Sequence, residues 1–257
     1  MVARQTARLT IPGMELWLLG ALFVLAVAVG AVNAAIGPTG GAMIGGVSLL
    51  VPPPLSITLH AATSAYSSLL RAVTLRRHID WALVRSLTAW SLPALIAASA
   101  VALQLPTRAW VAGLGAFLVA WAVSERLRDL VAALRRIGPV AALASVSAVW
   151  VGTGSMIVMP FVLARTGTKE RAIATEASYV AIQHLVKLAL LAPALAVSLH
   201  ELLWPAAVLL TGSTLGNFAG SRMLLRMSDR THARLLRTVL ALVGVALVVS
   251  AAVAGGA

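Results

Sequence analysis

The sequence contains no cysteine, so disulfide bonds, cysteine-based metal sites and cysteine nucleophiles are excluded. Charged residues are also scarce, at 11% of the 257 residues, whereas an average soluble domain has about 25%. Acidic residues are the scarcest, with 8 Asp and Glu against 20 Lys and Arg. Because most of these carboxylates lie between the apolar segments, a metal-dependent hydrolase acting inside a membrane would lack ligands.

Motifs of soluble and membrane-embedded enzymes are missing as well. The chain has no HExxH, GxSxG or P-loop pattern, and its 5 histidines are scattered. We therefore expect no enzymatic activity, no bound metal and no cofactor. Since no ATP-binding domain is present, the energy for any transport would come from a gradient or from a separate subunit.

Apolar residues are abundant instead, at 60% of the chain. A helix that crosses a bilayer needs about 20 apolar residues, so the length accommodates roughly eight spans and no soluble domain. The excess of basic residues falls in short loops between apolar blocks, where the positive-inside rule explains it better than nucleic-acid binding does. The predicted fold class is all-α, a multi-pass membrane bundle of about eight helices whose main partner is the lipid bilayer.

The apolar segments occur in two similar series. The first comprises residues 16–36, 42–51, 55–75, 81–105 and 109–123, and the second comprises residues 139–151, 155–164, 172–195, 202–225 and 235–253. A polar stretch separates them. We therefore predict a first repeat over residues 1–123, a cytoplasmic linker over 124–138 and a second repeat over 139–257, within one membrane domain.

Local motifs recur in the same order in both series. Ala62-Thr63-Ser64-Ala65 matches Ala174-Thr175-Glu176-Ala177, and Gly37-Pro38-Thr39-Gly40 matches Gly152-Thr153-Gly154 if one residue is skipped. Each match is weak by itself. Their common order is what indicates an internal repeat.

Loop charge predicts the orientation. Residues 71–85, 124–137, 165–171 and 222–237 are rich in Lys and Arg and are expected in the cytoplasm. Since residues 155–164 are too few to span a bilayer, residues 139–164 would form a re-entrant pair with its tip near 152–154. Three full spans per half would then invert the second repeat, although Arg4 and Arg8 would lie outside. The alternative is four spans per half in parallel repeats; we favour the inverted arrangement.

The two Gly-rich breaks are the first candidate site. A helix interrupted inside the membrane presents free backbone amides at the next helix N-terminus, and these amides favour an anion. Hydroxyl groups beside the breaks would add donors. Close packing of helices through small residues is the alternative explanation. The residues concerned are Gly37, Thr39, Gly40, Gly41, Gly152, Thr153, Gly154 and Ser155.

The helix after each break carries polar residues on one face. The first has His60, Ser64, Ser67 and Arg71 at helical spacing; the second has Glu176, Gln183 and Lys187, with His184 beside them. Ionisable side chains inside a bilayer usually face a cavity or a partner. Glu176 could pair with Lys187 or with another cation. A snorkelling interfacial position for Arg71 and a structural ion pair for Glu176 and Lys187 remain open.

Several segments resemble the sulfite exporter TauE/SafE family of membrane transporters. They are Asn33-Ala34-Ala35-Ile36-Gly37-Pro38-Thr39-Gly40-Gly41, Ala62-Thr63-Ser64, Arg76-Arg77-His78-Ile79-Asp80-Trp81, Gly152-Thr153-Gly154-Ser155, Ala174-Thr175-Glu176-Ala177 and Gly216-Asn217-Phe218-Ala219-Gly220-Ser221-Arg222. The resemblance covers residues 20–250 and implies about eight helices in the inner membrane and transport of small anions, among them sulfite and sulfoacetate. Glu176 departs from the family pattern, which usually has a small hydroxyl residue there.

The resulting hypothesis is a secondary transporter, in the exporting direction, for a small anion such as sulfite or an organosulfonate. The expected substrate-binding residues are Gly37, Thr39, Gly40, Gly41, Thr63, Ser64, Arg71, Gly152, Thr153, Gly154, Ser155, Thr175 and Lys187, with Glu176 and His184 as candidates for proton coupling. The alternatives are a cation or proton-coupled carrier that uses Glu176, and an accessory membrane protein without transport activity. A homo-oligomer is compatible with all three.

Overall fold

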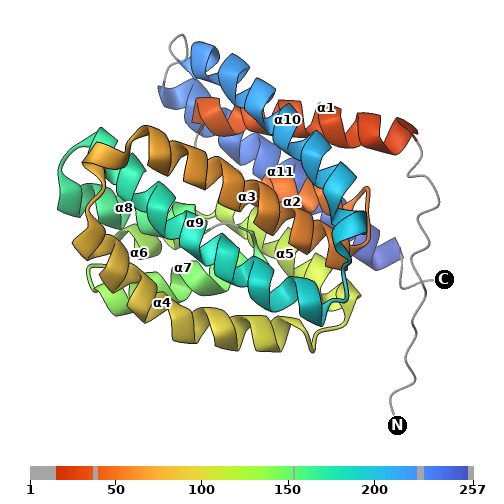
Figure 1. Cartoon of the computed structure of the whole chain (residues 1–257), viewed down its shortest axis with the longest axis horizontal. Coiled ribbons are helices and arrows are strands. Elements are labelled where there is room, and N and C mark those ends of the chain that lie inside the picture. Colours follow the sequence, from red (N-terminus) through yellow and green to blue (C-terminus); the bar gives the residue numbers. More distant parts are fainter. Residues whose placement is uncertain (1–15, 37–39, 153, 225–228, 254–257) are drawn as a thin grey trace.

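A computed structural model describes residues 16–36, 40–152, 154–224 and 229–253. Over these residues the fold is all-helical, which confirms the all-α part of the prediction (Figure 1). The helices are α1 (Leu16–Ile36), α2 (Gly40–Ser48), α3 (Pro53–Thr74), η1 (Arg76–His78), α4 (Trp81–Ala102), α5 (Thr107–Val123), α6 (Glu125–Ala132), α7 (Ile137–Trp150), α8 (Ser155–Thr166), α9 (Lys169–Ala194), α10 (Leu199–Leu224) and α11 (Asp229–Val253).

Polar caps and glycine define several helix ends. Asp80 accepts a hydrogen bond from the Leu83 amide at 3.0 Å and so begins α4. Ser124 and Thr168 cap α6 and α9 in the same way. Gly167 ends α8 with φ at 75°, a conformation that glycine adopts without steric cost.

Within the described part of the chain, three helices are long and apolar enough to cross a membrane by length and composition: α4, α9 and residues 200–220 of α10. Counting α5 and α6, which meet at 89°, as one bent span would make four. Shorter apolar helices occupy residues 16–32, 137–150, 155–166 and 237–253. The structure thus supports several membrane-crossing helices but does not confirm the predicted eight.

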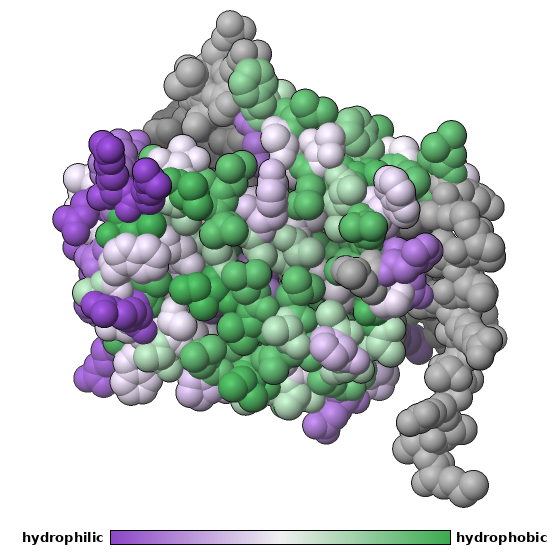
Figure 2. All heavy atoms as spheres, in the orientation of Figure 1, coloured by the Kyte–Doolittle hydropathy of each residue, from purple (hydrophilic) through white to green (hydrophobic). Residues whose placement is uncertain are grey.

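The surface matches a membrane environment. Figure 2 shows hydrophobic side chains over the middle of the molecule and hydrophilic ones gathered mainly at the left end. That end is where the turn between α3 and α4 lies in Figure 1, and it exposes Arg76, Arg77 and His78. Large apolar side chains exposed on the helices include Trp90, Ile96, Leu185, Leu190, Leu215 and Phe218.

Helices α5 and α11 pack together in opposite directions. The Arg108 guanidinium donates to the Ala251 carbonyl at 2.8 Å. At the other end of the pair, Arg237 lies 3.7 Å from Glu125. Helices α3 and α9 are also antiparallel, because the pairs His60–His184 and Arg71–Glu176 join residues in opposite order along the two helices.

Two further pairs run parallel. In α1 and α10, Gly212 faces Ala26 and Gly220 faces Ala31, so residue numbers rise together along both helices. In α4 and α7, Trp90 lies against Gly138, and farther along both helices Ala98 packs with Val149.

Helices α7 and α8 form a hairpin. Arg165, in the last turn of α8, donates to the carbonyl of Arg135 just before α7 at 3.2 Å. The chain therefore enters and leaves this hairpin at one end, and Val151, Gly152 and Gly154 lie at its tip. Helices α1 and α2 also fold back on each other, since Gly46 in α2 lies against the side chain of Leu25 in α1.

Replacing Gly115 with alanine is expected to lower the melting temperature of the purified protein. A Cβ atom at Gly115 would lie 2.7 Å from the backbone oxygen of Gly244 in α11. Because that atom belongs to a helix backbone, α5 and α11 would have to separate, at about 1–3 kcal/mol. Gly113→Ala is the matched control, since a Cβ there meets nothing within 4 Å. Equal melting temperatures for the two variants would contradict the close packing of α5 on α11.

Candidate functional site

The described residues beside the two Gly-rich breaks meet inside the bundle. A Cβ atom at Gly41, in the first turn of α2, would lie 3.4 Å from the Val151 carbonyl oxygen. A Cβ atom at Gly152 would lie 2.8 Å from Cγ2 of Ile44 in α2. The start of α2 is therefore in contact with the tip of the α7–α8 hairpin. Gly37, Thr39 and Thr153, which the sequence also assigned to this site, lie outside the described residues.

Gly152 is required at this tip by conformation and by space. Its φ is 79°, in the left-handed region that other residues avoid. A Cβ atom here would also lie 3.0 Å from Cε1 of His60 in α3. The hairpin from the second half of the chain thus touches a buried histidine from the first half.

Lys187 binds the end of α7. Its ammonium group donates to the carbonyl of Ala148 at 2.9 Å and lies 3.4 Å from that of Val149. These carbonyls belong to the last turn of α7, where the helix dipole favours a cation. The side chain is fully buried. Lys187 therefore fixes the backbone that leads into the tip.

Glu176 binds the beginning of α8. Its Oε1 accepts a hydrogen bond from the hydroxyl of Ser155, the first residue of that helix. Its Oε2 lies 4.0 Å from Nη1 of Arg71 and has no hydrogen bond. The cation nearest to Glu176 is therefore Arg71, and Lys187 is bonded to α7 instead.

His60 and His184 form a buried pair between α3 and α9. Their rings lie 5.3 Å apart at 68°. Nε2 of His60 is 3.1 Å from the Ser64 hydroxyl, and Nδ1 of each ring has no hydrogen bond. The sequence placed His60 only on the polar face of its helix, because nothing in the sequence indicates that it contacts Gly152.

Gln183 is a second residue near the tip that the sequence did not single out as a site residue. Its amide donates to the Ser145 hydroxyl at 3.0 Å and to the Tyr179 hydroxyl at 2.7 Å. Its Oε1 has no partner and would lie 3.1 Å from a Cβ atom at Gly154. The sequence placed Gln183 on the face of α9 that carries Glu176 and Lys187, and this spacing could have identified it as a site residue.

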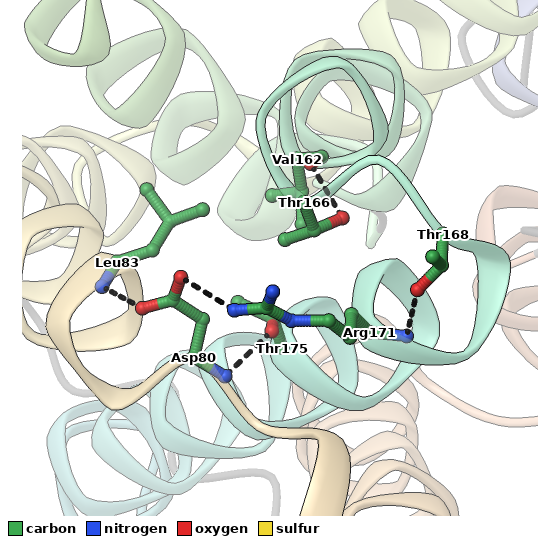
Figure 3. A network of polar contacts seen from close by, with 7 residues as sticks. All are labelled: Asp80, Leu83, Val162, Thr166, Thr168, Arg171 and Thr175. Atoms are coloured by element: carbon green, nitrogen blue, oxygen red, sulfur yellow. Dashed lines mark hydrogen bonds and ion pairs between the residues drawn. The ribbon is translucent and has the colours of Figure 1, made fainter.

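Two expected site residues are bonded elsewhere. The Thr63 hydroxyl donates to the Leu59 carbonyl of its own helix at 2.9 Å. The Thr175 hydroxyl accepts a hydrogen bond from the Asp80 amide at 3.0 Å. Asp80 in turn pairs with Arg171 at 3.5 Å, so that Thr175 belongs to the contact between α4 and α9 (Figure 3).

The centre of the bundle thus combines the N-termini of α2 and α8 with the buried ammonium of Lys187 and several unpaired polar atoms. Amide and hydroxyl donors at helix N-termini suit an oxyanion. No group of three or more metal-ligating side chains occurs among the residues that were described. The donors at these two helix N-termini are of a kind that suits an anion.

Family comparison agrees with this geometry. Comparison with curated proteins and with solved structures finds no match. The model of the family described as "Sulfite exporter TauE/SafE" matches residues 22–247, which is nearly the whole chain. The match includes both breaks, both polar helices and the α7–α8 hairpin. The chain therefore belongs to the sulfite exporter TauE/SafE family, whose members are membrane transporters of sulfur-containing anions and not enzymes.

Proposed function

We propose that this protein is a secondary transporter that exports a small sulfur oxyanion, sulfite or an organosulfonate, across the inner membrane. The observation that carries this proposal is the meeting of the two breaks: Gly41 at the start of α2 lies against Val151 at the tip of the α7–α8 hairpin. A site formed from both halves of the chain can open to either side when one half moves.

The substrate would bind between the hairpin tips. Backbone amides at Gly40 and Gly41 in α2, and at Ser155 in α8, would donate to its oxygens, together with the Ser155 hydroxyl. Lys187 and Arg71 would offset its charge. Irregular backbone at mid-membrane would be tolerated here because α2 packs on α3 and α8 packs on α9.

Helix directions support inverted repeats as the architecture. If residues 1–123 and 139–257 are repeats, then α3 corresponds to α9 and α5 to α11. Both pairs are antiparallel. A pseudo-two-fold axis in the membrane plane would relate the two repeats in this way, whereas an axis along the membrane normal would make corresponding helices parallel. The parallel contact of α1 with α10 has its counterpart in that of α7 with α4.

An orientation is part of the proposal. The α7–α8 hairpin begins and ends beside Arg135 and Arg165, which the positive-inside rule would place in the cytoplasm. The hairpin would then be re-entrant from the cytoplasm, and α1 with α2 would enter from the opposite side. The two tips would meet near mid-membrane.

The cation carrier remains the second hypothesis, since Glu176 is a buried carboxylate. The position of Arg71, 4.0 Å from Glu176, weakens it, because the guanidinium already offsets the charge that a bound cation would need. The two hypotheses differ in their dependence on Arg71. Replacing Arg71 with alanine should impair an anion transporter and leave a cation carrier active.

The proposal predicts selective anion flux in liposomes containing the purified protein. We expect flux of sulfite and sulfoacetate to exceed that of sulfate and chloride, with an imposed pH gradient altering its rate. Empty liposomes and liposomes with the Gly152→Ala variant are the controls. If none of these anions moves faster than in empty liposomes, the anion-transport proposal is wrong and the cation carrier or accessory role becomes the better hypothesis.

A further inference from the structure

The carboxylate of Glu176 lies where the proposed function places the substrate. It accepts the hydroxyl hydrogen bond of Ser155 at the first position of α8. Gly154, at the N-cap, has no side chain that could accept hydrogen bonds from the first amides of this helix. A negative charge at a helix N-terminus is stabilised by the dipole and by such amides. The Glu176 carboxylate therefore already supplies the negative charge that the N-terminus of α8 favours.

The other oxygen of Glu176 provides an independent observation. The side chain is only 1% exposed, yet Oε2 has no hydrogen bond. Arg71 is 4.0 Å away, too far for a hydrogen bond, and its side chain is 43% exposed. A buried carboxylate oxygen without a hydrogen bond is unfavourable. One acceptor oxygen of Glu176 is thus left without a donor beside the start of α8.

We propose that Glu176 is a competitor of the substrate built into the chain, and that substrate anion and proton bind together because of it. In this structure the Glu176 carboxylate accepts the hydrogen bond of the Ser155 hydroxyl at the start of α8. Uptake of one proton converts it to a neutral carboxyl group, which releases Ser155 to a small oxyanion. One monovalent anion then replaces one carboxylate charge, and both anion and proton leave on the other side. This inference rests on the proposed anion transport and adds its coupling residue.

In the first half of the chain, the position that corresponds to Glu176 holds no carboxylate. The motif Ala62-Thr63-Ser64-Ala65 corresponds to Ala174-Thr175-Glu176-Ala177, which aligns Ser64 with Glu176. The Ser64 hydroxyl is 3.1 Å from Nε2 of His60 and carries no charge. Coupling would therefore be a property of the α9 side alone.

Other titratable and charged groups surround α9, and the test must distinguish Glu176 from them. Arg71 is the one in contact with the carboxylate. Asp80 is paired with Arg171, and the two buried histidines face each other. Among the described elements that pack against α9, these groups are His60, Tyr66 and Arg71 on α3, Arg76, Arg77 and His78 on η1, Asp80 and Arg85 at α4, Arg165 on α8, and Lys169, Glu170, Arg171, Tyr179, His184 and Lys187 on α9 itself.

The experiment compares anion binding by the wild type and by Glu176→Gln, measured calorimetrically in detergent at mildly acidic and at alkaline pH. The probes are sulfite and methanesulfonate, since the charge of the sulfonate does not change over this range. We expect wild-type affinity to fall about tenfold or more at alkaline pH, within the usual range for coupled sites. Glu176→Gln should bind tightly at both pH values. Glu170→Gln removes an exposed carboxylate from the same helix and should behave like the wild type.

A second measurement uses liposomes. The Glu176→Gln variant should still exchange labelled anion for unlabelled anion, but a pH gradient should no longer drive net flux. Continued exchange also shows that the variant is folded. Loss of binding at every pH in a variant of normal elution volume, or a pH dependence equal to that of the wild type, would overturn the inference and leave anion transport intact. If neither probe binds to the wild type at any pH, the inference and the proposed function both fail.

Discussion

Replacing Gly152 with alanine is expected to abolish anion transport while the protein still inserts into the membrane. The residue has φ at 79°, where a side chain costs roughly 1–2 kcal/mol. The added methyl group would also lie 2.8 Å from Cγ2 of Ile44 and 3.0 Å from Cε1 of His60. The hairpin tip would have to withdraw from α2 and α3, which separates the two groups of donors. Flux in liposomes measures the result.

Gly167 offers a matched control for this variant. It has nearly the same φ, 75°, but a Cβ atom there meets nothing within 4 Å. Gly167→Ala should therefore lose similar backbone stability and keep its transport activity. If both variants transport equally well, the contact between the hairpin tip and the first half of the chain is not needed for function.

Replacing Lys187 with methionine is expected to have the second-largest effect. Methionine has a similar length but cannot donate to the carbonyls of Ala148 and Val149. A buried acceptor left without its partner costs roughly 1–3 kcal/mol, which would reduce the occupancy of the correctly formed tip by about 5- to 150-fold. We expect a corresponding loss of transport and a lower melting temperature.

Lys169 is the only other lysine in the chain and stands at the exposed start of the same helix. Lys169→Met should therefore be indistinguishable from the wild type in flux and melting temperature. A Lys187→Met variant with full transport would show that the bond to α7 is dispensable. A variant with normal stability but no transport would point to direct contact between the ammonium group and the substrate.

Much of the fold could be predicted from the periodic apolar segments, because these determine which residues are helical. The number of spans could not. Helix α3 has 22 residues but also the polar face with His60 and Arg71, which lowers its hydropathy below that of a typical span. Helices α7 and α8 are short because they fold back on each other. Length and composition are therefore poor guides where a helix is sheltered by its neighbours.

The site shows where sequence reasoning stops. Glycine at matching positions located both breaks, since backbone geometry is a local property. Partners of charged residues depend on packing between helices, so the bonds of Lys187 to α7 and of Glu176 to α8 could not be derived. One conclusion was within reach, however. Glu176 and Lys187 are far apart along one helix, about 16 Å at 1.5 Å per residue, which already argues against a direct ion pair between them.

The hydrogen bonds from Lys187 to α7 also constrain the order in which the helices insert into the membrane during synthesis. The ammonium that satisfies Ala148 belongs to a residue 39 positions later in the chain, so the nascent hairpin emerges before its partner exists. Lipid cannot substitute for that donor, and neither α7 nor α8 is long enough to be held across the bilayer by itself. We expect these two helices to wait at the cytoplasmic side until α9 leaves the ribosome. A nascent chain arrested before α9 should therefore remain open to protease between residues 137 and 166.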